Sequence, residues 1–376
     1  MTASIIPFVD VVADWSPLKA DALARIARVF EHGQFIMGPE VAEFEERLAA
    51  EINVNHAVSC SSGTTALQIA LMALGVGPGD EVILPGFTFA APLECVLLLG
   101  GTPVLADIDP STCLIDPDCV SALIGPKTRA IVAVSLYGRP VDVARLNAIA
   151  ARHGIAVIED AAQSYGAALR GNASGGLAAI GCLSFFPTKP LGAAGDGGAL
   201  AMNDSMLAAR IREIRDHGQD GKYNHARLGL NGRLNSITCA ALLSRLGTTT
   251  QAVMQRQAIA RCYDDLLKAA ADRGQLLLPP PVEGGTSAFA QYTIQIERRE
   301  EIMQDMLDAG VQVAVHYPRP LHHQPAYREL VSVRSLANAE LAARRVLCLP
   351  IYPTLTQSQQ QRVASVLTSS LDKRLS

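Results

Sequence analysis

The stretch that decides the fold runs from residue 129 to residue 159 and reads RAIVAVSLYGRPVDVARLNAIAARHGIAVIE. Its two ends, Arg129–Leu136 and Ile155–Glu159, are apolar runs rich in β-branched residues, which is typical of strands buried on both faces. A helix is predicted between them, beginning at Asp142, because aspartate is a good helix N-cap. A strand, a helix and a second strand in this order predict two parallel strands with a covering helix.

The same alternation extends over most of the first half of the chain. The further strands that we predict are Ala57–Cys60, Glu81–Leu84, Val104–Asp107, Cys182–Phe186 and Ala199–Met202. The further helices end near Leu74 and Leu99, begin at Asp116-Pro117, and cover Asp204–His217. Proline suits the first helical position, so Ser16-Pro17 and Gly38-Pro39 also predict helix starts. We therefore expect an α/β fold with a mostly parallel sheet, whose ligands bind at the carboxyl ends of the strands.

The pattern changes after Pro279-Pro280-Pro281. Before it, a long helix is predicted over Ser236–Lys268; the segments after it are a strand at Ala290–Ile296, a helix at Arg299–Ala309, a further strand, and helices near Leu336–Val346 and Gln357–Leu367. We predict a large α/β domain over residues 1–246, with an N-terminal arm at 1–15, and a smaller α+β domain over 247–376.

The composition excludes several classes of protein. Hydrophobic residues make up 49% of the 376 residues and charged residues 18%, the opposite of a disordered chain. A net charge of −4 gives no general attraction to nucleic acid or acidic membranes. No apolar run reaches the roughly 18 residues of a membrane span, and no basic segment begins a signal peptide. Because the eight cysteines form no C-x-x-C pair, we expect buried free thiols in a cytoplasmic protein and no metal site, with His322-His323 in a polar loop.

Three positions at strand ends could carry chemistry. In Ser59–Leu67 a strand is followed by hydroxyl residues, Gly63 and a helix start, which suits a phosphate. Asp160 follows a buried strand and could hold a proton on a heterocyclic nitrogen, or could simply cap a helix. Lys189 lies among aromatic, proline and glycine residues, and partial burial would free its amine for a Schiff base, although a surface lysine is the ordinary alternative. Together the three are what pyridoxal phosphate requires.

With these motifs the chain resembles the DegT-type (DegT/DnrJ/StrS) sugar aminotransferases, fold-type-I pyridoxal phosphate enzymes that act on nucleotide-linked keto sugars. The likeness runs from His32–Pro39 to His316-Tyr317-Pro318. It implies a mixed, mostly parallel sheet of the seven-stranded type and a smaller C-terminal α+β domain.

The resemblance also implies how the phosphate and one face of the cofactor are held. Gly63 and Thr64 would bind the phosphate at the helix start, and Ser184 would add a hydroxyl. Phe89, in Pro85–Phe89, would stack on the ring.

The remaining cofactor residues follow from the same likeness. Asp160 would pair with the pyridinium nitrogen, and Gln163 would bond near the ring hydroxyl. Lys189 would form the Schiff base and then carry the proton between substrate and cofactor carbons. Asn231 would reach the phosphate of the neighbouring subunit, so the resemblance implies a homodimer with shared active sites.

For the substrate, the resemblance points to Arg233, His316 and Tyr317. Residues 210–233 hold six basic and three acidic side chains, which would attract an anionic nucleotide sugar, although a solvated helix face would account for at least half of them.

The chain departs from the common family pattern at three positions. Thr65 stands where aspartate is frequent, and Gly232 replaces a common tyrosine. Pro190 replaces asparagine and matches the branch that aminates carbon 3 of UDP-linked N-acetylhexosaminuronic acids for surface polysaccharides such as O-antigen. Lys189 itself disfavours the dehydratase branch, which has histidine there.

We therefore expect an enzyme that moves an amino group from L-glutamate to UDP-2-acetamido-2-deoxy-3-keto-hexuronic acid. One alternative is amination at carbon 4 of a dTDP- or UDP-linked 4-keto-6-deoxy sugar. Another is a non-catalytic, pyridoxal phosphate-binding regulator. An NAD enzyme is disfavoured because the G-x-G-x-x-G fingerprint is missing.

Overall fold

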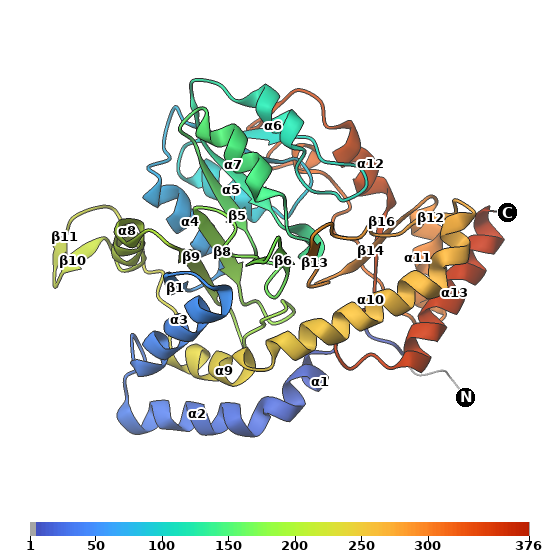
Figure 1. The fold of residues 1–376 in the computed structure, drawn as a ribbon, viewed down its shortest axis with the longest axis horizontal. Helices are drawn as coiled ribbons and strands as arrows, with labels where there is room; N and C mark the ends of the chain where they lie inside the picture. The colour runs from blue at the N-terminus through green and yellow to red at the C-terminus, as the bar shows by residue number, and fades with distance from the viewer. Residues whose placement is uncertain (1–4, 376) are drawn as a thin grey trace.

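A mixed sheet of eight strands forms the centre of the computed structural model, which describes residues 5–375 (Figure 1). The strand order is β1-β9-β8-β5-β4-β2-β3-β15. The strands are β1 (His56–Cys60), β2 (Glu81–Pro85), β3 (Thr102–Ala106), β4 (Thr128–Val134), β5 (Ala156–Asp160), β8 (Ile180–Ser184), β9 (Gly198–Met202) and β15 (Ser332–Val333). Only the pairings of β9 are antiparallel within this sheet. The predicted mostly parallel sheet is confirmed, and the short β15 adds an eighth strand to the seven-stranded type that the resemblance implies.

Helices cover the sheet and begin where short polar side chains cap them. The side chains of Ser62, Asp116, Asp142 and Asp204 each accept a backbone N–H in the first turn of the helix that follows. The four capped helices are α4 (Gly63–Ala73), α6 (Pro117–Leu123), α7 (Val143–Ala151) and α8 (Ser205–Arg215). A fifth helix, α5 (Ala91–Leu98), lies between α4 and α6 in the chain. With the strands they form one hydrophobic core.

A second layer of helices lies across the other side of the sheet in Figure 1. It consists of α1 (Val11–Trp15), α2 (Lys19–His32), α3 (Pro39–Ile52) and α9 (Ser236–Leu246). Pro39 begins α3 as predicted, but Pro17 lies in a 3-10 turn, Ser16–Leu18, and α2 begins only at Lys19. Helices α3 and α9 pack with inward residues of β1, β8 and β9 in a separate apolar cluster.

The single long helix predicted over Ser236–Lys268 is wrong. The chain forms α9 and then α10 (Thr249–Asp272), which continues in a different direction (Figure 1). The hydroxyls of Thr248 and Thr249 both donate to the C=O of Arg245, at 2.9 and 3.1 Å. These side chains compete with the backbone for a helical acceptor and end the first helix.

The C-terminal third builds a second apolar core around a small antiparallel sheet. Its elements are β12 (Leu276–Leu277), β14 (Tyr292–Ile296), β16 (Val346–Leu349), α11 (Arg299–Asp308) and α13 (Gln357–Leu375). Two elements of this third join the larger core or sheet instead, namely α12 (Ala337–Arg345) and β15. The domain division at residue 246 therefore stays a prediction.

Three short pairings complete the fold. They involve β13 (Gly285–Thr286) with β6 (Ala168–Leu169), β6 with β7 (Asn172–Ala173), and β10 (Gln219–Gly221) with β11 (Asn224–His225). The β10–β11 hairpin projects from the body at the far left of Figure 1. Among the described residues, no helix combines the length and the apolar character needed to cross a membrane.

Candidate active site

A cavity of about 430 Å³ opens at the carboxyl edge of the central sheet, where the fold predicts a ligand. Nine of the eleven residues predicted for the site line it, and they are Gly63, Thr64, Phe89, Asp160, Gln163, Ser184, Lys189, His316 and Tyr317. Asn231 and Arg233 do not line it. The structure therefore brings together residues that lie up to 254 positions apart in the chain.

The start of α4 forms one wall of this cavity. Gly63 and Thr64 occupy the first turn, where no earlier helical carbonyl can accept their N–H groups. A β-carbon on Gly63 would lie 2.6 Å from the β-carbon of Ser184, so glycine is required for β8 to approach the helix. Free N–H groups, a helix dipole and the Ser184 hydroxyl suit a phosphate group.

Asp160, the last residue of β5, faces the cavity and is 6% exposed. Burial raises the pKa of its carboxyl group, while the N–H of Ala162, at 3.0 Å, and the charge of Lys189 oppose that rise. A buried carboxylate with few partners favours a cation beside it. The protonated nitrogen of a heterocyclic ring meets that requirement.

Lys189 lies in a tight turn in which its N–H donates to the C=O of Phe186 at 2.8 Å. Burial lowers the pKa of its amine, and the charge of Asp160 works in the opposite direction. A lowered pKa increases the fraction of neutral, nucleophilic amine near neutral pH. The geometry supports the prediction that this lysine is not an ordinary surface residue.

Aromatic and amide groups form the opposite wall. The ring of Phe89, which is 55% exposed, lies 6.0 Å from that of Tyr317, centroid to centroid. Gln163 Nε2 donates to the Tyr317 hydroxyl at 3.5 Å. Burial, and then the charge of Lys189, lower the pKa of His316, so its imidazole is neutral near pH 7.

Three buried polar atoms of the wall have no hydrogen-bond partner among residues 5–375. They are Thr88 Oγ1, Gln291 Oε1 and His316 Nδ1. Unpaired polar atoms are rare in protein interiors and mark places where a ligand or water completes the bonding. They therefore fit a cavity built around a polar cofactor and substrate.

Sequence reasoning missed two of these residues, Thr88 and Gln291. Thr88 stands inside the motif Pro85–Phe89, in which the aromatic ring of Phe89 is the feature that suggests cofactor contact. Gln291 directly precedes β14 and lines the cavity, but nothing in the local sequence separates it from the other polar residues of this strand, Thr293 and Gln295. Only the tertiary fold could have identified it.

The basic segment 210–233 is partly ion-paired within the subunit. Arg215 is 4% exposed and lies 2.5 Å from Glu45, Arg227 pairs with Glu213, and Arg233 pairs with Asp216. Half of its six basic side chains are thus ion-paired. Glu213 and Asp216 already belong to the charge count of this segment, so only Glu45 further reduces the positive charge that it offers an anionic substrate.

Two departures from the family pattern touch each other. A β-carbon on Gly232 would lie 3.1 Å from Thr65 Cγ2 and 2.5 Å from Leu230 Cδ1. The Thr65 hydroxyl bonds to those of Ser61 and Ser62, both at 2.9 Å. At these two positions the chain uses small residues that pack together beside the helix start.

His322, His323 and Glu340 place three ligand-type atoms within 4.8 Å of one another. His322 Nε2 lies 3.1 Å from Glu340 Oε1, while its Nδ1 is buried without a hydrogen-bond partner in the described chain. A metal-binding imidazole normally donates its second N–H to an acceptor. What the structure shows is a hydrogen-bonded contact between this loop and α12. All eight cysteines are free, and six are buried.

Comparison with known proteins agrees with this geometry. Residues 17–368 match the DegT/DnrJ/EryC1/StrS aminotransferase family. The chain is 45% identical to the UDP-2-acetamido-2-deoxy-3-oxo-D-glucuronate aminotransferase of Pseudomonas aeruginosa, covering 97% of this chain and 100% of the relative. It is 41% identical to a pleiotropic regulatory protein of Geobacillus stearothermophilus, covering 95% and 96%. The crystal structure of S. venezuelae DesV in complex with a ketimine intermediate has a TM-score of 0.95 at 38% identity, covering 98% of this chain and 99% of DesV.

Proposed function

The chain belongs to the DegT/DnrJ/EryC1/StrS aminotransferase family and uses pyridoxal 5'-phosphate, and we propose that it transfers an amino group from L-glutamate to a keto carbon of a nucleotide-linked sugar. The observation that carries this proposal is the meeting of the α4 start, Asp160 and Lys189 in one cavity. An anion cradle, a buried acid and an amine of lowered pKa match the phosphate, ring nitrogen and aldehyde of that cofactor.

Each residue has a distinct task in this chemistry. The N–H groups of Gly63 and Thr64 hold the phosphate, and Asp160 keeps the ring nitrogen protonated. When bound, the cofactor withdraws electrons from the carbon that carries the amino nitrogen and makes its proton removable. The amine of Lys189 would hold the aldehyde of the cofactor and, when free, would move this proton. The side chains of Phe89 and Tyr317 exclude water from one side of the ring.

The substrate that we favour is UDP-2-acetamido-2-deoxy-3-keto-hexuronic acid, aminated at carbon 3 for surface polysaccharide synthesis. Support comes from the Pseudomonas aeruginosa relative, which matches over its full length, and from Pro190, which is typical of that branch. Carbon 4 of a 4-keto-6-deoxy sugar is the alternative acceptor. The buried free thiols favour a reducing compartment such as the cytoplasm.

We further propose a homodimer with shared active sites. The corner between α2 and α3 exposes a group of large apolar side chains, Phe30, Phe35, Ile36 and Met37, each at least 40% exposed. Apolar patches of this kind mark interaction surfaces. Asn231 is exposed and lies outside the cavity of its own subunit, as a residue that serves the neighbouring site would.

The test is Lys189→Ala, compared with Lys268→Ala, a surface lysine paired with Asp272. Turnover is measured with L-glutamate and the keto sugar, or in reverse with the 3-amino sugar nucleotide and 2-oxoglutarate. We expect Lys189→Ala to lose at least about 10³-fold in kcat and Lys268→Ala to match the natural protein. Multiple turnovers by the Lys189→Ala protein would overturn the mechanism.

A non-catalytic regulator is distinguished by one further measurement on the natural protein. L-Glutamate should change the absorption spectrum of the bound cofactor if the protein is an aminotransferase. An unchanged spectrum, with the cofactor bound at full occupancy, would favour the regulator, for which the Geobacillus stearothermophilus relative is a precedent in name.

A further inference from the structure

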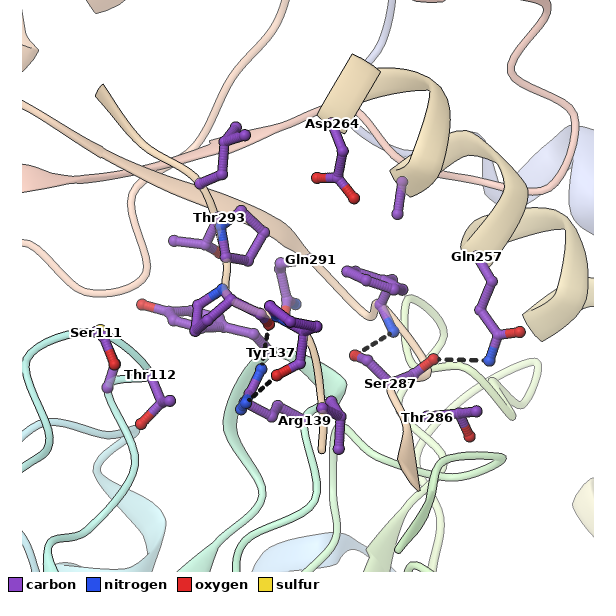
Figure 2. Close-up of a pocket in the computed structure, with 18 of the residues that line it drawn as sticks. Ser111, Thr112, Tyr137, Arg139, Gln257, Asp264, Thr286, Ser287, Gln291 and Thr293 are labelled. Atoms are coloured by element: carbon purple, nitrogen blue, oxygen red, sulfur yellow. Dashed lines mark hydrogen bonds between the residues drawn. The ribbon is translucent and has the colours of Figure 1, made fainter. Parts of the chain in front are cut away.

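Tyr137 lies behind the wall of the cofactor cavity rather than inside it. It is the middle residue of the 3-10 turn Leu136–Gly138, which follows β4, and it is 8% exposed. It lines a second cavity, of about 610 Å³, between the end of β4, α10 and β14 (Figure 2). Gln291 borders both cavities, so the two lie on opposite sides of one thin wall.

Each polar group of Tyr137 bonds to a residue of that wall. Its N–H donates to Gln163 Oε1 at 2.7 Å, and its C=O accepts the N–H of Gln291 at 3.4 Å. Its hydroxyl donates to the backbone C=O of His316. One buried residue therefore connects three wall segments that are far apart in the sequence.

The backbone of Tyr137 has φ 61° and ψ 10°, in the left-handed region. Residues with a β-carbon avoid this region, and glycine or asparagine is the usual choice there. Such a conformation persists only when its surroundings fix it, and it is often found at functional sites. Here it is fixed by bonds from both backbone groups, and the tyrosine side chain adds the bond to His316.

Gly138 strengthens the same connection. Its C=O accepts the N–H of Ala288 at 2.8 Å and the hydroxyl of Ser287 at 3.0 Å. Ser287 is also held through its C=O, which accepts from Gln257 of α10 at 2.9 Å (Figure 2). The turn is therefore anchored to the segment that leads into β14.

The bond from Tyr137 determines which way the Gln163 amide points. Because Oε1 accepts from Tyr137, the NH₂ end is directed toward the Tyr317 hydroxyl and the cavity. Gln163 thus presents a donor to whatever the cavity holds. If the cavity holds pyridoxal phosphate, an oxygen of that ring is the matching acceptor.

We propose that Tyr137 is a positioning residue of the active site: it orients the Gln163 amide and anchors the His316–Tyr317 segment against the bound cofactor and nucleotide sugar. This proposal rests on the proposed function for the identity of the two ligands. Tyr137 touches neither of them and acts through the three wall residues.

The test is Tyr137→Phe, with Tyr263→Phe as the matched control. Tyr263 is also buried, and its hydroxyl also donates to a backbone carbonyl, that of Pro350 at 2.9 Å, but it lies in the second core. Binding of UDP-2-acetamido-2-deoxy-D-glucuronate, which carries a hydroxyl in place of the keto group, is measured by calorimetry on the cofactor-loaded protein. We expect Kd to rise about tenfold in Tyr137→Phe and to stay unchanged in Tyr263→Phe.

Equal Kd values for Tyr137→Phe and the natural protein would overturn the proposal. So would an equal rise in both variants, because it would show a general loss of structure. The measurement needs no turnover, so a failed amination assay would count against the proposed function alone.

Gln163→Glu tests the amide orientation and remains informative if Tyr137→Phe does not fold. Glutamate keeps an acceptor for the Tyr137 N–H but replaces the donor that faces the cavity. We expect the visible circular dichroism of the bound cofactor to change. An unchanged spectrum would show that the assigned orientation, and with it the role of Tyr137, is wrong.

Discussion

Strand β5 ends in two adjacent buried carboxyl groups, Glu159 and Asp160, which point to opposite sides of the sheet because side chains alternate along a strand. Glu159 is fully buried, at 0% exposed, and it accepts four hydrogen bonds. The donors are the hydroxyls of Ser135 at 3.1 Å and Ser174 at 2.5 Å and the N–H groups of Gly175 at 2.9 Å and Leu177 at 3.3 Å.

Among the described residues, the carboxylate of Asp160 accepts one hydrogen bond, from Ala162, and otherwise faces the cavity and the charge of Lys189. Burial raises the pKa of both carboxyl groups, so neither burial nor pKa distinguishes them. The two carboxyl groups differ in the number of hydrogen bonds that their oxygens accept. Glu159 ties the loop after β7 to the sheet, whereas Asp160 keeps its capacity for a ligand.

The largest effect that this contrast predicts is on activity, from Asp160→Asn. The amide oxygen can still accept from Ala162, so the fold should be retained. Under the proposed function the ring nitrogen would lose its anionic partner, and we expect kcat to fall about 10²–10³-fold while Tm changes little. Steady-state kinetics and thermal unfolding check both parts.

Glu159→Gln is the matched control for that experiment, since it makes the same change one residue earlier on the other face. Its amide oxygen can accept from Gly175 and Leu177, and its NH₂ group can donate to the two serine hydroxyls. Activity close to that of the natural protein is expected. A loss as large as that of Asp160→Asn would remove the distinction between the two carboxyl groups.

The next effect is on stability, from Glu159→Leu. Leucine accepts no hydrogen bond, so two backbone N–H groups and two hydroxyls lose their acceptor in the interior. We expect the free energy of unfolding to fall by about 3 kcal/mol, measured by urea denaturation. A change below about 0.5 kcal/mol would mean that the four bonds do not hold the loop.

The sequence could predict the elements whose signal is local. Each strand predicted in the first half is present within two residues, because a buried parallel strand needs a continuous apolar run that a reader can see. Asp160 and Lys189 could be predicted as candidate site residues because each lies at or shortly after the end of such a strand, at the ligand-binding edge. The break before α10 could not be predicted, because it depends on which backbone carbonyl accepts the hydrogen bonds of the Thr248 and Thr249 hydroxyls.

Most of the supporting residues depend on long-range contacts and had no local signal. The sequence predicts Glu159 only as the end of a strand, because its donors Ser174, Gly175 and Leu177 follow it by 15 to 18 residues. Tyr137 meets His316 across 179 positions. Contacts of this kind exist only after the sheet and the second core have come together.

The smallest predicted effect is a gain in stability instead of a loss, and it concerns Thr88, which lines the cavity. Its buried hydroxyl has no partner within residues 5–375, so it pays a desolvation cost without a bond in the cofactor-free protein. Thr88→Val removes the hydroxyl and keeps the shape. We expect the free energy of unfolding of the cofactor-free protein to rise by about 0.5–1 kcal/mol and kcat/KM to fall less than about tenfold.

Thr293→Val is the control, because the Thr293 hydroxyl lies 3.2 Å from Cys348 Sγ and the protein should lose stability on the same change. If both variants were destabilised alike, the unpaired atoms of the wall would not mark the ligand site, and the contrast between the two sides of β5 would rest on Asp160 alone.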